Sequence, residues 1–231
     1  MTLVKDLGRL LGAAVLLLLV MLGLGKLLVG VLLDGPVGRL DDRIEFDLAQ
    51  ARTASRNALS HTGSSLADPM TVQVALVVVV VLVALLTRRL RPPLFVALAV
   101  GLESAIYFLV STWVPRNRPG VPRLGTADPI ASFPSGHAAA SLCLYGALAV
   151  LAWRLTTNRP LQVLLTAVAV TVPVIVGFCR MYRGFHHLTD VLAGLFLGGV
   201  WLWLCTRYVL DDHEDGRAKR RHEQPAEPVS A

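Results

Sequence analysis

The chain has 231 residues, of which 54% are hydrophobic and only 16% are charged. A water-soluble domain of this length carries more charge and holds its apolar residues in shorter runs, so the composition excludes that class. The formal charge of +6 does not indicate a nucleic-acid partner, because the sequence has no basic stretch interleaved with aromatic residues. We therefore expect an integral membrane protein whose surroundings are membrane lipids.

The sequence has six apolar blocks, and several of them reach the roughly 20 residues that a helix needs to cross a hydrocarbon core about 30 Å thick. The six blocks extend over about residues 10–33, 71–86, 94–114, 137–153, 161–178 and 188–209. The first block follows two basic residues, as the apolar part of a signal peptide does, but it is too long and lacks a small-residue cleavage site. The sequence therefore predicts an all-α, polytopic fold, with one six-helix transmembrane domain over residues 1–210.

Two segments do not fit the pattern of a spanning helix. Residues 34–69 are polar, with apolar residues at helical spacing, which predicts an amphipathic helix at the interface: Leu40, Ile44, Leu48 and Ala51. Residues 211–231 are charged and show no apolar periodicity, so we predict a disordered cytoplasmic tail.

The distribution of basic residues predicts the orientation in the membrane. Six spans place both termini on one side, and most basic connections share that side, which the positive-inside rule makes cytoplasmic. Two loops on the opposite side also contain arginines, namely Arg116, Arg118, Arg123, Arg180 and Arg183. Because local exceptions to a general rule indicate function, we expect the active site in these extracytoplasmic loops.

Three groups of residues in those loops carry chemistry. They are Arg116-Asn117-Arg118-Pro119, Ser132-Phe133-Pro134-Ser135-Gly136-His137 before an apolar helix, and Arg180 with His186 and Asp190. Arginine presents a planar fork that matches phosphate oxygens, so Arg116, Arg118 and Arg180 are candidate phosphate ligands. The second group lies at the start of a predicted helix, where backbone N–H groups without intrahelical partners can bind an anion. Ser135 and Gly136 are therefore candidate phosphate ligands as well.

His186 and Asp190 are four residues apart, so on a helix they lie on one face. The aspartate can then accept the proton of one imidazole nitrogen, which leaves the other nitrogen free to attack. His137 is available as a general acid, whereas Arg183 and His187 are interpreted as solvated interfacial residues. We predict phosphoryl transfer with His186 as nucleophile and without metal or cofactor, since the sequence shows no clustered carboxylates and its three cysteines are widely spaced.

These motifs resemble the type 2 phosphatidic acid phosphatase (PAP2) family, whose superfamily also contains vanadium-dependent haloperoxidases. The family signatures Lys-x6-Arg-Pro, Pro-Ser-Gly-His and Ser-Arg-x5-His-x3-Asp match here at Arg118-Pro119, at 134–137, and at Arg180, His186 and Asp190. The resemblance covers most of the chain before the tail. It implies a six-helix bundle and a phosphohistidine formed on His186. It also implies that His137 protonates the leaving group and then activates water.

The sequence departs from the family pattern at two positions. Ser111 occupies the place of the signature lysine, and Cys179 that of the signature serine. Two other features fall outside the motifs. Glu103 lies inside an apolar block, where a structural hydrogen bond and a substrate role are both open. Gly194 and Gly198, four residues apart, predict close helix packing.

The resemblance implies a membrane lipid phosphatase acting on a phosphate monoester or diphosphate. Candidate substrates are phosphatidate, phosphatidylglycerophosphate and a polyprenyl diphosphate such as undecaprenyl diphosphate. A lipid phosphotransferase with an alcohol acceptor and a non-catalytic lipid-binding protein remain alternatives. The motifs do not distinguish these substrates or acceptors, and the sequence leaves the oligomeric state open.

Overall fold

The computed structural model describes residues 2–126 and 131–211, so the predicted tail beyond Asp211 lies outside the described residues. The described residues form eight α-helices and two π-helical turns. The helices are α1 (Thr2–Leu27), α2 (Pro36–Gln50), α3 (Ala54–Ser65), α4 (Pro69–Thr87), α5 (Arg91–Trp113), α6 (Gly136–Leu155), α7 (Arg159–Tyr182) and α8 (Leu188–Cys205). The π-helical turns η1 (Leu28–Leu32) and η2 (Thr206–Asp211) extend α1 and α8.

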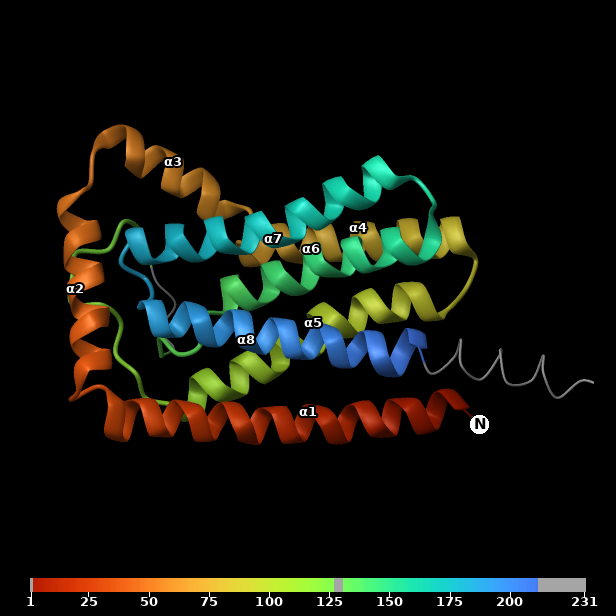
Figure 1. The fold of residues 1–231 in the computed structure, drawn as a ribbon, viewed down its shortest axis with the longest axis horizontal. Coiled ribbons are helices and arrows are strands. Elements are labelled where there is room, and N and C mark those ends of the chain that lie inside the picture. Colours follow the sequence, from red (N-terminus) through yellow and green to blue (C-terminus); the bar gives the residue numbers. More distant parts are fainter. Residues whose placement is uncertain (1, 127–130, 212–231) are drawn as a thin grey trace, which may run out of the picture.

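The described residues contain six helical segments long and apolar enough to cross a membrane. These segments are built on α1, α4, α5, α6, α7 and α8, which run side by side along the long axis of the molecule (Figure 1). The predicted integral membrane protein with six spans is thereby confirmed. Large apolar side chains on the outer surface, such as Leu16, Val77 and Val174, are about half exposed or more, as expected where lipid is the solvent.

Local chemistry sets the helix starts. Proline stands in the first turn of α2, α4 and α7, where its missing N–H would have had no intrahelical partner. At the start of α7, the Asn158 side chain also accepts a hydrogen bond from Leu161 N at 3.1 Å. At the end of α4, Arg88 adopts a left-handed conformation with φ of 49°, which stops the helix before α5.

Helices α6 and α8 approach each other closely through glycines. A Cβ on Gly194 would clash with the carbonyl oxygen of Ser135, and one on Gly198 would lie 2.8 Å from that of Ala139. The predicted close packing at these two glycines is confirmed. Since Ser135 immediately precedes α6, the packing also sets the position of the start of α6 relative to α8.

The two ends of the bundle are fastened by different polar contacts. At one end, Arg91 donates to Asp6 at 3.2 Å and to the carbonyl oxygen of Val209 at 2.9 Å. This contact brings the start of α1, the start of α5 and the end of η2 together. The loop between α5 and α6 and the turn between α7 and α8, which carry predicted motifs, lie at the opposite end, where α2 crosses the ends of the spanning helices (Figure 1).

Residues 34–69 fold differently from the predicted amphipathic helix. They form two helices, α2 and α3, and the buried face of α2 is acidic. Asp41 and Glu45 are 2% and 8% exposed, whereas Leu40 is 52% exposed. The apolar periodicity correctly indicated a helix but not which face is buried, because the acidic face has a basic partner in a distant loop.

Candidate active site

Four segments from three distant regions of the sequence build the candidate site. They are α2, the loop between α5 and α6, the start of α6, and the turn between α7 and α8. Backbone hydrogen bonds hold the last three together. Ser132 N donates to Arg116 O at 2.9 Å, and Ser135 N donates to Asp190 O at 2.9 Å. The three sequence motifs therefore meet at one end of the bundle, as the sequence predicted.

His186 lies in the turn before α8 and is 3% exposed. Its Nδ1 atom is 2.9 Å from the carbonyl oxygen of Ser132. A backbone carbonyl only accepts hydrogen bonds, so Nδ1 carries the proton and Nε2 is left with a lone pair. The same tautomer serves nucleophilic attack by Nε2.

The surroundings of His186 also keep its ring neutral. Burial, together with the positive charges of Arg180 and Arg118, lowers the pKa of His186 from 6.5 to about 4, although Asp190 opposes this shift. An uncharged imidazole at neutral pH is the form that can attack phosphorus. The two arginines thus lie close enough to His186 for their charges to act on its ring.

Asp190 lies 3.8 Å from His186 Nδ1, which is too far for a hydrogen bond. The predicted direct pairing is therefore replaced by an indirect one through Ser132. The hydroxyl of Ser132 donates to Asp190 Oδ2 while its carbonyl oxygen accepts from His186. Asp190 Oδ2 also accepts from the backbone N of His187 at 2.9 Å, so the carboxylate caps the first turn of α8.

Arg180 and Arg118 are two of the three arginines predicted to bind phosphate. The guanidinium of Arg180 stacks over the ring of Phe185 at 4.1 Å, and its Nη1 is 3.3 Å from Ser64 Oγ on α3. Arg118 Nη1 donates to the carbonyl oxygen of Phe185 at 2.8 Å. Both guanidinium groups are thus held beside the turn that carries His186.

Arg116 lies differently from the predicted phosphate contact. Its Nη2 donates to Asp41 on α2 at 2.6 Å, and its Nη1 donates to Asp190. The side chain of Arg116 is 2% exposed. Because its two terminal nitrogens are occupied by carboxylates, Arg116 joins α2 to the start of α8 rather than facing a substrate.

The start of α6 carries three further predicted residues. Ser135 Oγ is buried and has no hydrogen-bond partner among the described residues, as expected for a group that a phosphate oxygen would satisfy. Gly136 packs against the ring of Tyr107, which a Cβ would meet at 2.8 Å. His137 lies close enough to His186 and both arginines for their charges to act on its ring, and its Nε2 is 3.4 Å from Asp68 Oδ1.

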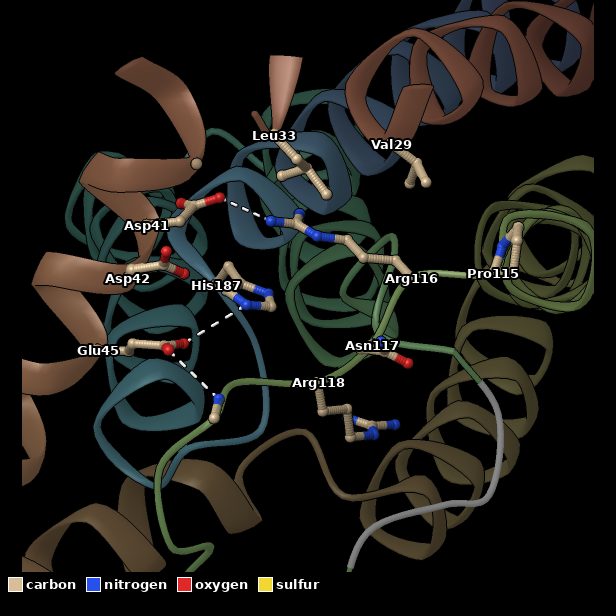
Figure 2. Close-up of a pocket in the computed structure, with 12 residues that line it drawn as sticks. Val29, Leu33, Asp41, Asp42, Glu45, Pro115, Arg116, Asn117, Arg118 and His187 are labelled. Atoms are coloured by element: carbon tan, nitrogen blue, oxygen red, sulfur yellow. Dashed lines mark hydrogen bonds and ion pairs between the residues drawn. The ribbon is translucent and has the colours of Figure 1, made fainter. Parts of the chain in front are cut away.

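An acidic cluster on α2 was missed from the sequence. Asp41, Asp42 and Glu45 line a cavity of about 390 Å³, together with residues of the motif loops (Figure 2). Glu45 Oε2 lies 3.4 Å from His187 Nε2, and the Nδ1 of the same ring lies 3.1 Å from Asp190 Oδ2. Burial raises the pKa of Glu45, and the neighbouring His187 opposes this.

The sequence showed no clustered carboxylates, but the fold brings Asp41, Asp42 and Glu45 together at one cavity. Ligand atoms of Asp42, Glu45 and His187 lie within 4.8 Å of one another, a spacing compatible with a bound cation. His187, interpreted from the sequence as a solvated interfacial residue, is thus part of the polar network. His187 lies three residues before Asp190, which is the spacing between the N-cap and N3 residues of a capping box. This spacing was the signal in the sequence that His187 contacts Asp190.

The fold and the site together define a helical membrane protein with two histidines and two arginines converging at one end of the bundle. Residues 70–214 match the model of the PAP2 superfamily, and this chain belongs to that superfamily. It is 31% identical over 115 residues to phosphatidylglycerophosphatase B of Bacillus subtilis (strain 168), an alignment that covers 48% of this chain. The chain thus spans about half, 55%, of the length of that curated relative.

A solved structure shows the same fold. The crystal structure of a transmembrane PAP2-type phosphatidylglycerolphosphate phosphatase from Bacillus subtilis superposes with a TM-score of 0.73. The superposition covers 84% of this chain and 94% of the other, at 23% sequence identity. The predicted PAP2-type helical bundle is therefore confirmed.

Proposed function

We propose that this protein is a lipid phosphatase that hydrolyses a phosphate monoester or diphosphate through a phosphohistidine on His186. One observation carries the proposal: a buried, neutral His186 has Nδ1 bonded to Ser132 O and Nε2 left unprotonated beside Arg118 and Arg180. The similarity to phosphatidylglycerophosphatase B makes phosphatidylglycerophosphate the first of the candidate substrates to test. Phosphatidate and undecaprenyl diphosphate are the competitors that a substrate panel must include.

The roles of the site residues follow from their chemistry. Nε2 of His186 forms the bond to phosphorus as the bond to the leaving oxygen breaks, and His137 supplies that oxygen with a proton. His137 then takes a proton from water, which attacks the phosphohistidine and releases phosphate. Arg118, Arg180, Ser135 Oγ and the N–H groups at the start of α6 stabilise the charge on the transferred group.

We also propose that the site faces the extracytoplasmic side. The end of the bundle with Arg91 collects the basic connections that the positive-inside rule assigns to the cytoplasm. The candidate site lies at the opposite end (Figure 1). A lipid presented on the outer leaflet would then reach it directly.

The test is phosphate release by the purified protein in detergent, with phosphatidylglycerophosphate, phosphatidate and undecaprenyl diphosphate supplied in parallel. We expect His186→Ala to abolish release, and His137→Ala to slow both the formation and the hydrolysis of the phosphohistidine because His137 acts in both steps. His61→Ala on α3, an exposed histidine, is the matched control and should retain full activity. Full activity of His186→Ala would refute the mechanism.

Two additions to the assay separate the alternatives. Vanadate, which mimics pentacoordinate phosphorus, should inhibit, whereas EDTA should leave hydrolysis intact. Loss of activity in EDTA would instead point to a cation at Asp42, Glu45 and His187. An alcohol acceptor such as glycerol tests the transferase alternative, which predicts phosphorylated acceptor in place of free phosphate.

A further inference from the structure

A second cavity, of about 260 Å³, lies between α4, α5 and α6. It is distinct in position from the acidic cavity beside α2. Its polar lining comes from Gln73, Glu103, Ser104, Tyr107 and His137. Because His137 is also part of the candidate active site, the cavity leads from the phosphate site into the membrane-spanning part of the bundle.

Glu103 is the unusual residue of this cavity. It lies in the middle of α5 and is 0% exposed. Its Oε2 is 3.4 Å from Ser104 Oγ, and its Oε1 has no hydrogen-bond partner among the described residues. Ser104 Oγ is itself 2.9 Å from the carbonyl oxygen of Val100, so its own hydrogen is already used. A buried carboxyl with an unused polar atom therefore lines the cavity.

An ionised carboxylate in the centre of a spanning helix would be costly, because no water is there to solvate its charge. No cation pairs with Glu103 in the parts of the chain that the structure describes, so the carboxyl group is expected to hold its proton. A protonated carboxyl is a hydrogen-bond donor. The cavity thus offers one strong donor to whatever enters it.

The distance between Glu103 and the candidate phosphate site restricts which substrate group could accept a hydrogen bond from Glu103. Glu103 lies one helical turn, about 5.4 Å of rise, from Tyr107, whose ring packs on Gly136 at the start of α6. Phosphatidate carries ester carbonyls a few bonds beyond its phosphorus, and those carbonyls only accept hydrogen bonds. In phosphatidylglycerophosphate a glycerol and a phosphodiester separate the terminal phosphorus from the esters, so its ester carbonyls lie well beyond this distance. A polyprenyl chain has no polar group at that position.

We propose that Glu103 donates a hydrogen bond to an ester carbonyl of the substrate and so selects phosphatidate, in which the esters lie close to the phosphate, over polyprenyl diphosphates. This inference rests on the proposed phosphatase function and adds its substrate class. Gln73 and Ser104 line the same cavity and make it more polar. Loss of one such hydrogen bond should reduce kcat/KM by about 5- to 10-fold.

The experiment compares Glu103→Gln and Glu103→Leu on three substrates: diacyl phosphatidate, its dialkyl ether analogue, and undecaprenyl diphosphate. We expect Glu103→Leu to lose about 5- to 10-fold in kcat/KM on the diacyl substrate and to remain within about twofold of the native protein on the other two. Glu103→Gln keeps a donor and should stay near the native value on all three. Thr112→Val, on the exposed side of α5, is the matched control.

The outcomes are distinguishable. Equal losses on all three substrates, or a native value for Glu103→Leu on the diacyl substrate, would overturn the ester contact and leave the phosphatase activity standing. Hydrolysis of undecaprenyl diphosphate in preference to diacyl lipids by the native protein would do the same. Failure of the native protein to release phosphate from any of them would overturn the proposed function and the inference with it. If Glu103→Leu does not fold, a Glu103→Gln variant that loses diacyl activity selectively also refutes the donor role.

Discussion

Replacing Arg116 by methionine removes the link between α2 and α8 while keeping most of the side-chain volume. Arg116 donates to Asp41 at 2.6 Å and to Asp190, and the two carboxylates are 2% and 0% exposed. Methionine would leave both buried carboxylates without their cation. Removing one partner from a buried ion pair costs about 3–5 kcal/mol, because the remaining charge is desolvated and uncompensated.

A loss of that size should lower Tm by about 6–20 °C in a protein of this length. Thermal unfolding in detergent, followed by tryptophan fluorescence, measures the loss, and phosphate release measures the accompanying displacement of Asp190. The matched control is Arg43→Met on α2, since Arg43 lies 4.0 Å from Asp47 in a pair that is 82% and 67% exposed. That exposed pair should contribute no more than about 1 kcal/mol.

Combining Arg116→Met with Asp41→Asn provides an internal check. The amide removes one of the two stranded charges, so the double variant should be more stable than the sum of the single changes predicts. Additive effects would show that Arg116 and Asp41 do not interact. A Tm for Arg116→Met within about 2 °C of the native protein would refute the reasoning about the buried network.

Three further predictions concern pH, packing and the cysteine of the third motif. Because burial lowers the pKa of His186 from 6.5 to about 4, kcat/KM should stay flat down to about pH 5 and fall below it. The unfolded chain then binds more protons between these values, so His186 contributes stability above pH 6.5 that is lost as the pH falls towards 4; an activity midpoint near pH 6.5 would contradict this. Gly136→Ala should cost about 1–3 kcal/mol and most of the activity, because its Cβ would meet Tyr107 at 2.8 Å, whereas Gly101→Ala, with nothing within 4 Å, should not destabilise. Cys179→Ser should keep activity within about twofold, since the two side chains fill similar space, and maleimide labelling of native Cys179 should be slow because it is 6% exposed.

The sequence predicted the spanning helices and the meeting of the three motifs, because both depend on local signals. Long apolar runs determine the spans, and residue type together with spacing identifies His186, Asp190 and the start of α6. The roles of the individual residues in catalysis remain predictions that the variants above test.

The contacts within the site could not be read from residue types. The partner of His186 Nδ1 is a backbone carbonyl, that of Ser132, and every residue carries such a group. Arg116 pairs with Asp41, which lies 75 residues away in the sequence. This pair forms only when α2 packs against the loop that carries Arg116. Apolar periodicity indicated the helix, and a distant ion pair determined which face it buries.

Asp190 has two tasks that normally belong to different residues. It caps the first turn of α8 through His187 N, and it is the carboxylate on which Ser132 and Arg116 converge. The contacts of Arg91 with Asp6 and Val209 fasten the far end of the bundle independently. A solubilised sample can therefore retain its helix content while the end that holds the candidate site has come apart. Specific activity is then a more sensitive measure of an intact preparation than circular dichroism.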